Sequence, residues 1–97
     1  MDEINTWEPI SGKYHLQYQI TRDGRVRDTE RKDLKVYRNN PKGNVYYVYL
    51  KLPFEKRQQR VRLTRLMWET FNGPLEDTER IKLVSPFNLH INNLRKV

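Results

Sequence analysis

Histidine is the side chain best suited to moving a proton near neutral pH, so the two histidines of the chain, His15 and His90, are the natural candidates for acid–base chemistry. His90 stands close to Asn92 and Asn93, and a histidine base beside an amide ligand could activate water at a divalent cation. His15 stands far from that group, and we interpret it as a surface histidine. We therefore expect no catalytic residue. If residual activity exists, its candidates are His90, Asn92 and Asn93.

Other patterns that support catalysis or tight cofactor binding are missing from the sequence. There is no Cys, which excludes a disulfide framework and a cysteine-based zinc site. No Gly-rich phosphate loop, nucleophile elbow or paired-carboxylate pattern is present, and the acidic Glu76 and Asp77 have no histidine at ligand spacing. We expect no metal and no cofactor, with Mg²⁺ relevant only to a residual nuclease.

Positive charge points most directly to a partner. The net charge is +7, and it is uneven: residues 13–65 carry fifteen bases and five acids, a net charge of +10, whereas residues 1–12 carry −3 and residues 66–97 carry zero. Such an excess is expected of a protein that binds a polyanion. The bases that we predict to contact nucleic acid are Arg22, Arg25, Arg27, Lys35, Arg38, Lys42, Lys51, Arg57, Arg60, Arg62 and Arg65.

These bases lie in stretches that we expect to form β-structure. Arginines and lysines on a sheet mainly contact phosphates, which gives a salt-sensitive affinity with limited sequence readout. A two-stranded ribbon can also enter the major groove of DNA. We expect DNA as the partner, with RNA as an alternative. Tyr46, Tyr47 and Tyr49 could stack on the bases of a single strand, although strand alternation turns Tyr46 inward.

Apolar and polar residues alternate along several short stretches, which is the pattern of half-buried strands. Asp23 and Gly24 predict a tight hairpin turn, and Asn39–Asn44 is the strongest turn pattern in the sequence. Arg60 and Arg62 are expected to face outward beside each other. We predict strands over residues 13–20, 25–27, 34–37, 45–52 and 59–63.

Helical spacing replaces the two-residue period in the last third of the chain. Thr64 can cap a helix that ends at Gly73 and Pro74. We expect a short strand over residues 81–84 and a short closing helix over residues 88–94. The inner face of the main helix would carry Leu66, Met67, Thr70 and Phe71.

The length and composition fit one small folded domain. Ninety-seven residues allow a modest core, and eleven aromatic residues supply material for it. We assign residues 1–97 to a single α+β domain, with a basic β-hairpin portion over 13–63 and a helical portion over 64–97. The acidic N-terminus has no apolar run, and no stretch is long and apolar enough to span a membrane, so we expect a cytoplasmic protein without a membrane partner.

Five stretches, in order along the chain, carry a resemblance to a known family. They are Trp7–Gly12, Tyr18–Val26, Lys42–Leu50, Arg62–Gly73 and Asn92–Arg95. Together they resemble the phage HNH homing endonucleases, in which two hairpins and a basic segment with a helix precede the HNH motif. The resemblance implies a small antiparallel β-sheet of hairpins followed by a degenerate HNH-like ββα region.

The residues that such a nuclease uses for catalysis are replaced in this chain. The family's motif supplies a His general base, a neighbouring Asp and a downstream Asn, which hold one divalent cation. The stretch aligned with the His and the Asp reads Leu83, Val84, Ser85. Thr64 stands where the family has a further His, and Asn92 or Asn93 remains for the Asn.

We therefore expect a catalytically inactive HNH-endonuclease-like protein that binds nucleic acid, double-stranded DNA first, through a basic β-sheet face. It would act as a phage or mobile-element regulator or accessory protein in the cytoplasm or nucleoid of the host cell. Two alternatives stay open. The first is a phage-encoded protein-binding module that inhibits or modulates an acidic host enzyme. The second is a residual metal-dependent nuclease built on His90 and an Asn.

Overall fold

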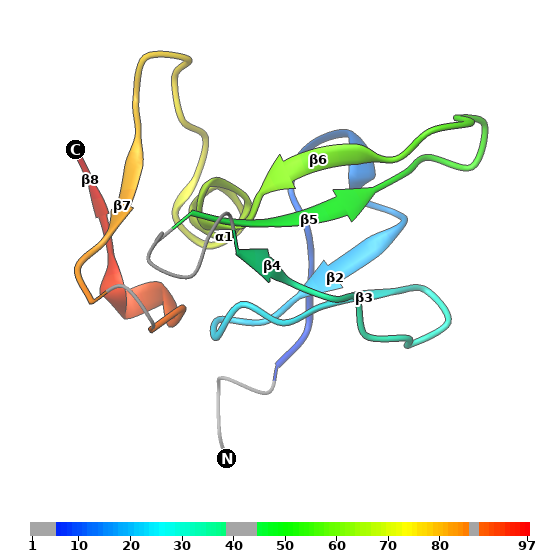
Figure 1. The fold of residues 1–97 in the computed structure, drawn as a ribbon, viewed down its shortest axis with the longest axis horizontal. Helices are drawn as coiled ribbons and strands as arrows, with labels where there is room; N and C mark the ends of the chain where they lie inside the picture. The colour runs from blue at the N-terminus through cyan, green and yellow to red at the C-terminus, as the bar shows by residue number, and fades with distance from the viewer. Residues whose placement is uncertain (1–5, 39–44, 86–87) are drawn as a thin grey trace.

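The structure is a computed structural model that describes residues 6–38, 45–85 and 88–97 (Figure 1). These residues form three small antiparallel sheets and one α-helix, which confirms the predicted α+β class. The helix, α1, lies against the second sheet, and the third sheet lies beside it at the C-terminal end (Figure 1).

The first sheet holds the predicted Asp23–Gly24 hairpin. Its turn closes with a hydrogen bond from the Thr21 amide to the Arg25 carbonyl, and Gly24 has a φ of +85°, a conformation that glycine adopts without steric cost. The hairpin prediction is therefore confirmed. The strands, in sheet order, are β1 (Glu8–Pro9), β2 (Tyr18–Ile20) and β3 (Val26–Asp28).

The strand predicted over residues 13–20 is wrong in its first half. Gly12–Tyr14 forms a short 3-10 helix, and the amide of Gln17 donates to the carbonyl of Tyr14. The apolar residues of this stretch do not share a face, because Tyr14 is buried whereas Leu16 is 78% exposed. Backbone groups satisfied within tight turns are not free to join a ladder, so only Tyr18–Ile20 pairs as a strand.

The second sheet contains the strand that the sequence predicted most clearly. On it, Tyr46, Val48 and Leu50 are buried, whereas Tyr47 and Tyr49 are on the other face, as strand alternation requires. The predicted turn at 39–44 lies outside the described residues. The strands, in sheet order, are β4 (Tyr37–Arg38), β5 (Tyr46–Leu50) and β6 (Gln59–Arg62).

The strand predicted over residues 34–37 overlaps β4 only at Tyr37. The segment before it belongs to the first sheet instead, because Asp33 bridges Arg27 and the amide of Leu34 donates to the carbonyl of Val26 at 2.8 Å. The backbone groups of this segment therefore pair with the first sheet and are not available to the second sheet.

The helix α1 (Leu63–Asn72) begins one residue earlier than its predicted cap. Arg62 is the N-cap residue, with extended backbone, while Thr64 lies inside the helix with 4% of its surface exposed. The capping role predicted for Thr64 is therefore wrong, since burial of Leu63 draws the first turn into the core. Gly73, with a φ of +102°, ends the helix where the sequence predicted.

The third sheet includes a strand that the sequence did not predict. The predicted closing helix over 88–94 is wrong, because Ile91–Asn93 makes only a 3-10 turn, η3, and the chain then becomes extended. Leu94 pairs with Leu83 across the sheet and both are buried, which favours a strand there. The two strands are β7 (Ile81–Leu83) and β8 (Leu94–Lys96).

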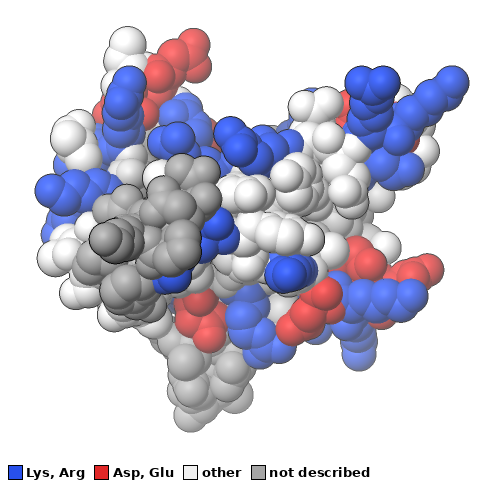
Figure 2. Space-filling model, in the orientation of Figure 1, with Lys and Arg blue, Asp and Glu red and all other residues white. Residues whose placement is uncertain are grey.

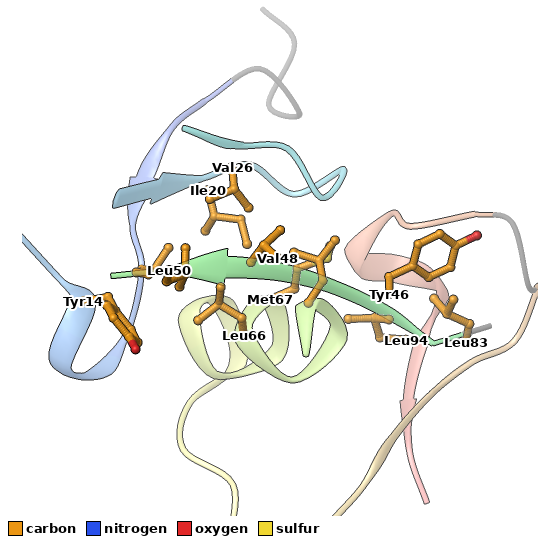
Figure 3. Packing of buried hydrophobic residues seen from close by; sticks show 12 residues of the cluster. Tyr14, Ile20, Val26, Tyr46, Val48, Leu50, Leu66, Met67, Leu83 and Leu94 are labelled. Carbon is orange, nitrogen blue, oxygen red and sulfur yellow. The ribbon is translucent and has the colours of Figure 1, made fainter. Parts of the chain in front are cut away.

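The hydrophobic core lies between α1 and the two larger sheets. In Figure 3, Leu66 and Met67 of the helix approach β5 from one side, and Ile20 and Val26 of the first hairpin approach it from the other. Val48 at the centre has no exposed surface. The core thus fixes the position of β5, and with it the outward side chains of the second sheet.

Candidate nucleic-acid interface

The outward face of the second sheet carries three tyrosines in mutual contact. Tyr37 lies opposite Tyr47 in the β4–β5 register, and their rings stack at 5.6 Å between centroids with an interplanar angle of 15°. Tyr49 meets Tyr37 and Tyr47 edge-on, at 5.5 and 5.6 Å. These rings are half-buried by one another, and together they form a rigid aromatic surface.

Basic side chains surround this aromatic surface. The Lys35 ammonium lies 5.0 Å from the centre of the Tyr37 ring, and the Arg60 guanidinium lies 5.1 Å from the centre of the Tyr47 ring. Arg62, exposed, pairs with Tyr47 in the β5–β6 register. The tyrosine–arginine face, as we name it, consists of Lys35, Tyr37, Tyr47, Tyr49, Arg60 and Arg62.

The charge on this face is of one sign. β4, β5 and β6 contain no Asp or Glu. Figure 2 shows uncharged side chains over the middle of this sheet with lysines and arginines around them, while acidic groups lie mainly below this region and at the top of the view. A shallow cleft of about 320 Å³ opens between Val45, Tyr47, Arg60 and Arg62. Two guanidinium groups at one cleft can hold an anion such as a phosphate.

Two predicted arginines of the first hairpin are held by Trp7. Arg25 and Arg27 lie over its ring, with guanidinium-to-centroid distances of 5.2 and 4.1 Å. Arg25 also pairs with Asp33 at 2.8 Å, and this hydrogen bond and charge raise the pKa of Arg25 above its ordinary value. A guanidinium neutralised by a carboxylate attracts a polyanion less strongly, so Arg27 is the freer charge of the two.

Another predicted base, Arg65, is used inside the protein. Its guanidinium donates to the backbone carbonyls of Leu75, Glu76 and Glu79, and it pairs with Glu69 at 3.4 Å. Arg65 thus fastens the loop after α1 and has little capacity left for a phosphate.

The remaining predicted bases are spread over the molecule. Arg22 lies over the Phe71 ring at 4.7 Å, away from the tyrosine–arginine face. Arg38, Lys51 and Arg57 are exposed at the ends of β4 and β5 and in the β5–β6 turn. Lys42 lies outside the described residues. The structure therefore gathers Lys35, Arg60 and Arg62 from the predicted set on one surface, with the tyrosines between them.

The positions aligned with the nuclease's catalytic histidines lie together, and they are apolar or buried. Leu83 is 3% exposed and Thr64 is 4% exposed, and both line one pocket of about 180 Å³ with Lys82. A leucine side chain and an ammonium offer no ligand to a divalent cation, and one threonine hydroxyl does not make up for the missing imidazole and carboxylate ligands. In the described ranges, no group of three His, Cys, Asp or Glu residues could hold a metal ion.

The weak catalytic candidates are neighbours with structural partners. His90 accepts a hydrogen bond at Nδ1 from the Asn92 amide at 3.0 Å, which caps η3. The Asn93 side chain donates to the carbonyls of Ser85 and Asn88 and accepts from the Ser85 amide at 3.0 Å. His90 and Asn93 thus connect residues on the two sides of the segment between β7 and β8. This structural role explains both residues without catalysis.

Sequence reasoning missed two contributors to the candidate interface. Tyr37 was read only as the end of a strand, although it has the same parity as Lys35 and so shares its face. Trp7 begins the first stretch of the family resemblance, and no pattern in the sequence indicates that two arginines of a later hairpin lie over its ring.

Comparison with known proteins supports the fold and does not define a family. No family model matches the chain, and no curated protein matches it. A solved structure, described as "DNA binding and cleavage by the HNH homing endonuclease I-HmuI", superposes with a TM-score of 0.77 at 23% sequence identity. The match covers 95% of this chain and 52% of that one, so the chain spans about half the length of the endonuclease.

This likeness establishes an HNH-like α+β fold for the chain. Among the described residues, no helix has the length and apolar character needed to cross a membrane.

Proposed function

We propose that this protein binds double-stranded DNA through its tyrosine–arginine face and does not cut it. The observation that carries the proposal is the acid-free sheet face on which Lys35, Arg60 and Arg62 surround stacked tyrosines. The likeness in fold to a homing endonuclease described as binding and cleaving DNA supports the choice of DNA.

The physical chemistry of the face suits a phosphate backbone. Arg60 and Arg62 flank one cleft, so they can contact neighbouring phosphates, and the ring of Tyr47 holds the Arg60 guanidinium in place. Each phosphate contact releases condensed counterions, so the affinity is expected to fall as salt is added. The rings add a stiff contact surface that costs little conformational entropy on binding.

The replaced residues of the motif support the second half of the proposal, that the protein does not cut DNA. Leu83 and Thr64 occupy the pocket where histidines would stand, and His90 and Asn93 are engaged in closing a loop. A protein that holds DNA without cutting it fits a regulatory or accessory role for a phage or mobile element.

A salt titration of duplex binding by fluorescence anisotropy tests this proposal. We expect log K to fall linearly with log salt concentration, and the R60Q/R62Q double variant to bind more weakly with a slope reduced by about 0.9 per lost phosphate contact. The matched control is Lys32→Gln, which removes an exposed charge already paired with Glu30 at 3.7 Å. Its affinity should stay close to that of the unchanged protein.

Two results would contradict the proposal. The first is duplex binding that does not respond to salt or to the R60Q/R62Q change. The second is no duplex binding at low salt, together with a stoichiometric protein partner captured from nuclease-treated lysate. That second result would favour a protein-binding module, because exposed tyrosine and arginine are also common at protein interfaces.

A further inference from the structure

A second basic cleft lies apart from the tyrosine–arginine face. It has a volume of about 680 Å³ and opens between the β2–β3 turn, the C-terminal half of α1 and the segment from η3 to β8. In Figure 1 the β2–β3 turn lies close to η3, and the amide of Ile91 donates to the carbonyl of Arg22 at 2.7 Å. We call it the C-terminal cleft; its functional lining is Arg22, Trp68, Phe71, His90, Asn92 and Arg95.

The cleft is built on a packed base. Ile91 ties η3 to the hairpin turn, and Leu89 lies so close to Gly24 that an added Cβ would stand 3.1 Å from the Cβ of Leu89. The Arg22 guanidinium lies over the Phe71 ring, 4.7 Å from its centre. The lining is therefore organised before any ligand arrives, which lowers the entropy cost of binding.

The lining offers hydrogen-bond donors without a compensating negative charge. Nη1 of Arg95 donates to the carbonyls of Asn92 and Leu94, and no described residue accepts a hydrogen bond from its Nε or Nη2. Since His90 accepts a hydrogen bond at Nδ1, its ring hydrogen is on Nε2. In the described part of the chain neither Arg22 nor Arg95 has an ion-pair partner, and no lining residue is acidic.

Aromatic surface lies next to these donors. Trp68 and Phe71 are half-buried on the same helix and border the cleft. Arg22 lies 4.7 Å from the centre of the Phe71 ring, whereas the Lys96 ammonium lies 6.0 Å from the centre of the Trp68 ring, so Trp68 is the less closely covered of the two. A ligand that fits must bring an anion with several acceptor oxygens and a flat group to stack on an indole.

We propose that the C-terminal cleft binds a phosphate monoester carried by a nucleoside. The phosphate lies between the guanidinium groups of Arg22 and Arg95, and the base stacks on Trp68. Such a group occurs both in a free nucleotide and at the 5′-phosphorylated end of a nucleic-acid strand. The cleft lies on other elements than the tyrosine–arginine face, so this site does not depend on the proposed duplex binding.

The test compares four probes on the full chain: inorganic phosphate, adenosine 5′-monophosphate, and a short single strand with either a 5′-phosphate or a 5′-hydroxyl. Binding is followed by ¹H–¹⁵N chemical-shift changes and by isothermal titration. We expect the 5′-phosphorylated strand to bind about tenfold more tightly than its 5′-hydroxyl twin, with shifts at Trp68, Phe71 and η3. Adenosine 5′-monophosphate as tight as the phosphorylated strand would identify a free nucleotide as the ligand.

Variants localise the effect. Arg22→Gln and Arg95→Gln should each remove most of the tenfold preference, whereas Lys32→Gln, at an exposed lysine after β3, should retain it. The backbone carbonyl of Arg22 still accepts from Ile91 in the glutamine variant, so the cleft keeps its shape. The R60Q/R62Q variant, made for the duplex test, should bind the nucleotide unchanged, which separates failure of one proposal from failure of the other.

Three results would overturn the inference. Equal binding of the phosphorylated and hydroxyl strands removes the phosphate site. A preference for the 5′-phosphorylated strand that survives both Arg22→Gln and Arg95→Gln would show that the phosphate binds outside this cleft. Inorganic phosphate binding as tightly as adenosine 5′-monophosphate removes the role of the stacked base.

Discussion

At the scale of single residues, the arginines of this protein do different work despite their common charge. Arg65 fastens a loop through three carbonyls, and Arg25 is paired with Asp33. Arg60 lies on a tyrosine ring at the surface, with its N–H groups available to solvent. A basic sequence therefore predicts attraction to a polyanion in general, and the neighbours of each base decide which ones can contact it.

Glu79 offers a residue-scale test of how the C-terminal strand is held. Its carboxylate accepts a hydrogen bond from the Glu76 amide at 2.9 Å and pairs with Lys96 of β8 at 2.8 Å. The backbone hydrogen bond and then the Lys96 contact lower the pKa of Glu79 below its ordinary value of 4.5. Because the folded-state pKa is the lower one, this stabilisation is complete above pH 4.5 and is lost as the pH falls through the folded value.

We therefore expect Glu79→Gln to lower the free energy of unfolding at pH 7 and to make little difference at pH values well below 4.5. Urea denaturation of the two proteins at both pH values measures this, and comparing the pair cancels the protonation of other carboxyl groups. A stability difference that grows toward acid pH would mean that Glu79 is strained rather than stabilised in the folded protein.

At the scale of elements, the β2–β3 hairpin supports both its own sheet and the C-terminal segment. Gly24 has a φ of +85°, and an added Cβ would also meet the Cβ of Leu89 at 3.1 Å. Gly12 has nearly the same φ, +84°, but an added Cβ there would meet nothing within 4 Å. Substitution of either glycine would therefore strain the backbone to a similar degree, but only substitution of Gly24 would also produce a steric clash.

We expect Gly12→Ala to destabilise the protein by about 1 kcal/mol, the cost of a left-handed conformation for an L residue. Gly24→Ala should cost about 2–3 kcal/mol, since it adds a clash in a packed region. Chemical denaturation gives both values, and Gly12→Ala is the matched control. If the two variants lose the same free energy of unfolding, Leu89 moves away freely and the hairpin does not support the C-terminal segment.

The same elements show how far the sequence could predict the fold. The strand around Val48 was predicted because β-branched and aromatic residues follow a strong turn pattern there, and its alternating burial confirms the prediction. The stretch 13–17 alternates as well, but Tyr14 reaches the core from a 3-10 turn, and period alone does not distinguish these cases. β8 was missed because Leu94 is a strand residue only through its pairing with Leu83, a contact between distant positions.

The candidate site was predictable in part for a similar reason. Arg60 and Arg62 were expected to face outward side by side, and their register against β5 has them do so. The stacking of Tyr37 on Tyr47 required knowledge of which strands pair, and the C-terminal cleft required three elements far apart in sequence. Contacts of that kind are set by tertiary packing and leave no local pattern to read.

At the scale of the whole molecule, the HNH-like fold contains a pocket whose lining includes the buried Leu83 and Thr64. Leu83 cannot bind a cation, and restoring a histidine there would bury a polar ring at a position that is 3% exposed and packed against Leu94. The packing of β7 and β8 therefore disfavours a metal-binding histidine at this position. The proposed DNA binding does not depend on a metal there, because the tyrosine–arginine face lies on another sheet.

We therefore expect no cleavage when supercoiled plasmid is incubated with the protein and Mg²⁺ or Mn²⁺ at concentrations that saturate duplex binding. His90→Ala is the decisive companion, because His90 is the one described histidine close to the asparagines of the degenerate motif, and its Nδ1 already accepts from Asn92. Nicking that requires the metal and disappears in His90→Ala would show a working site and defeat the proposal of binding without cutting. Nicking that persists in His90→Ala would indicate a contaminating nuclease. In that case a preparation of R60Q/R62Q, which binds DNA more weakly, should nick the plasmid to the same extent.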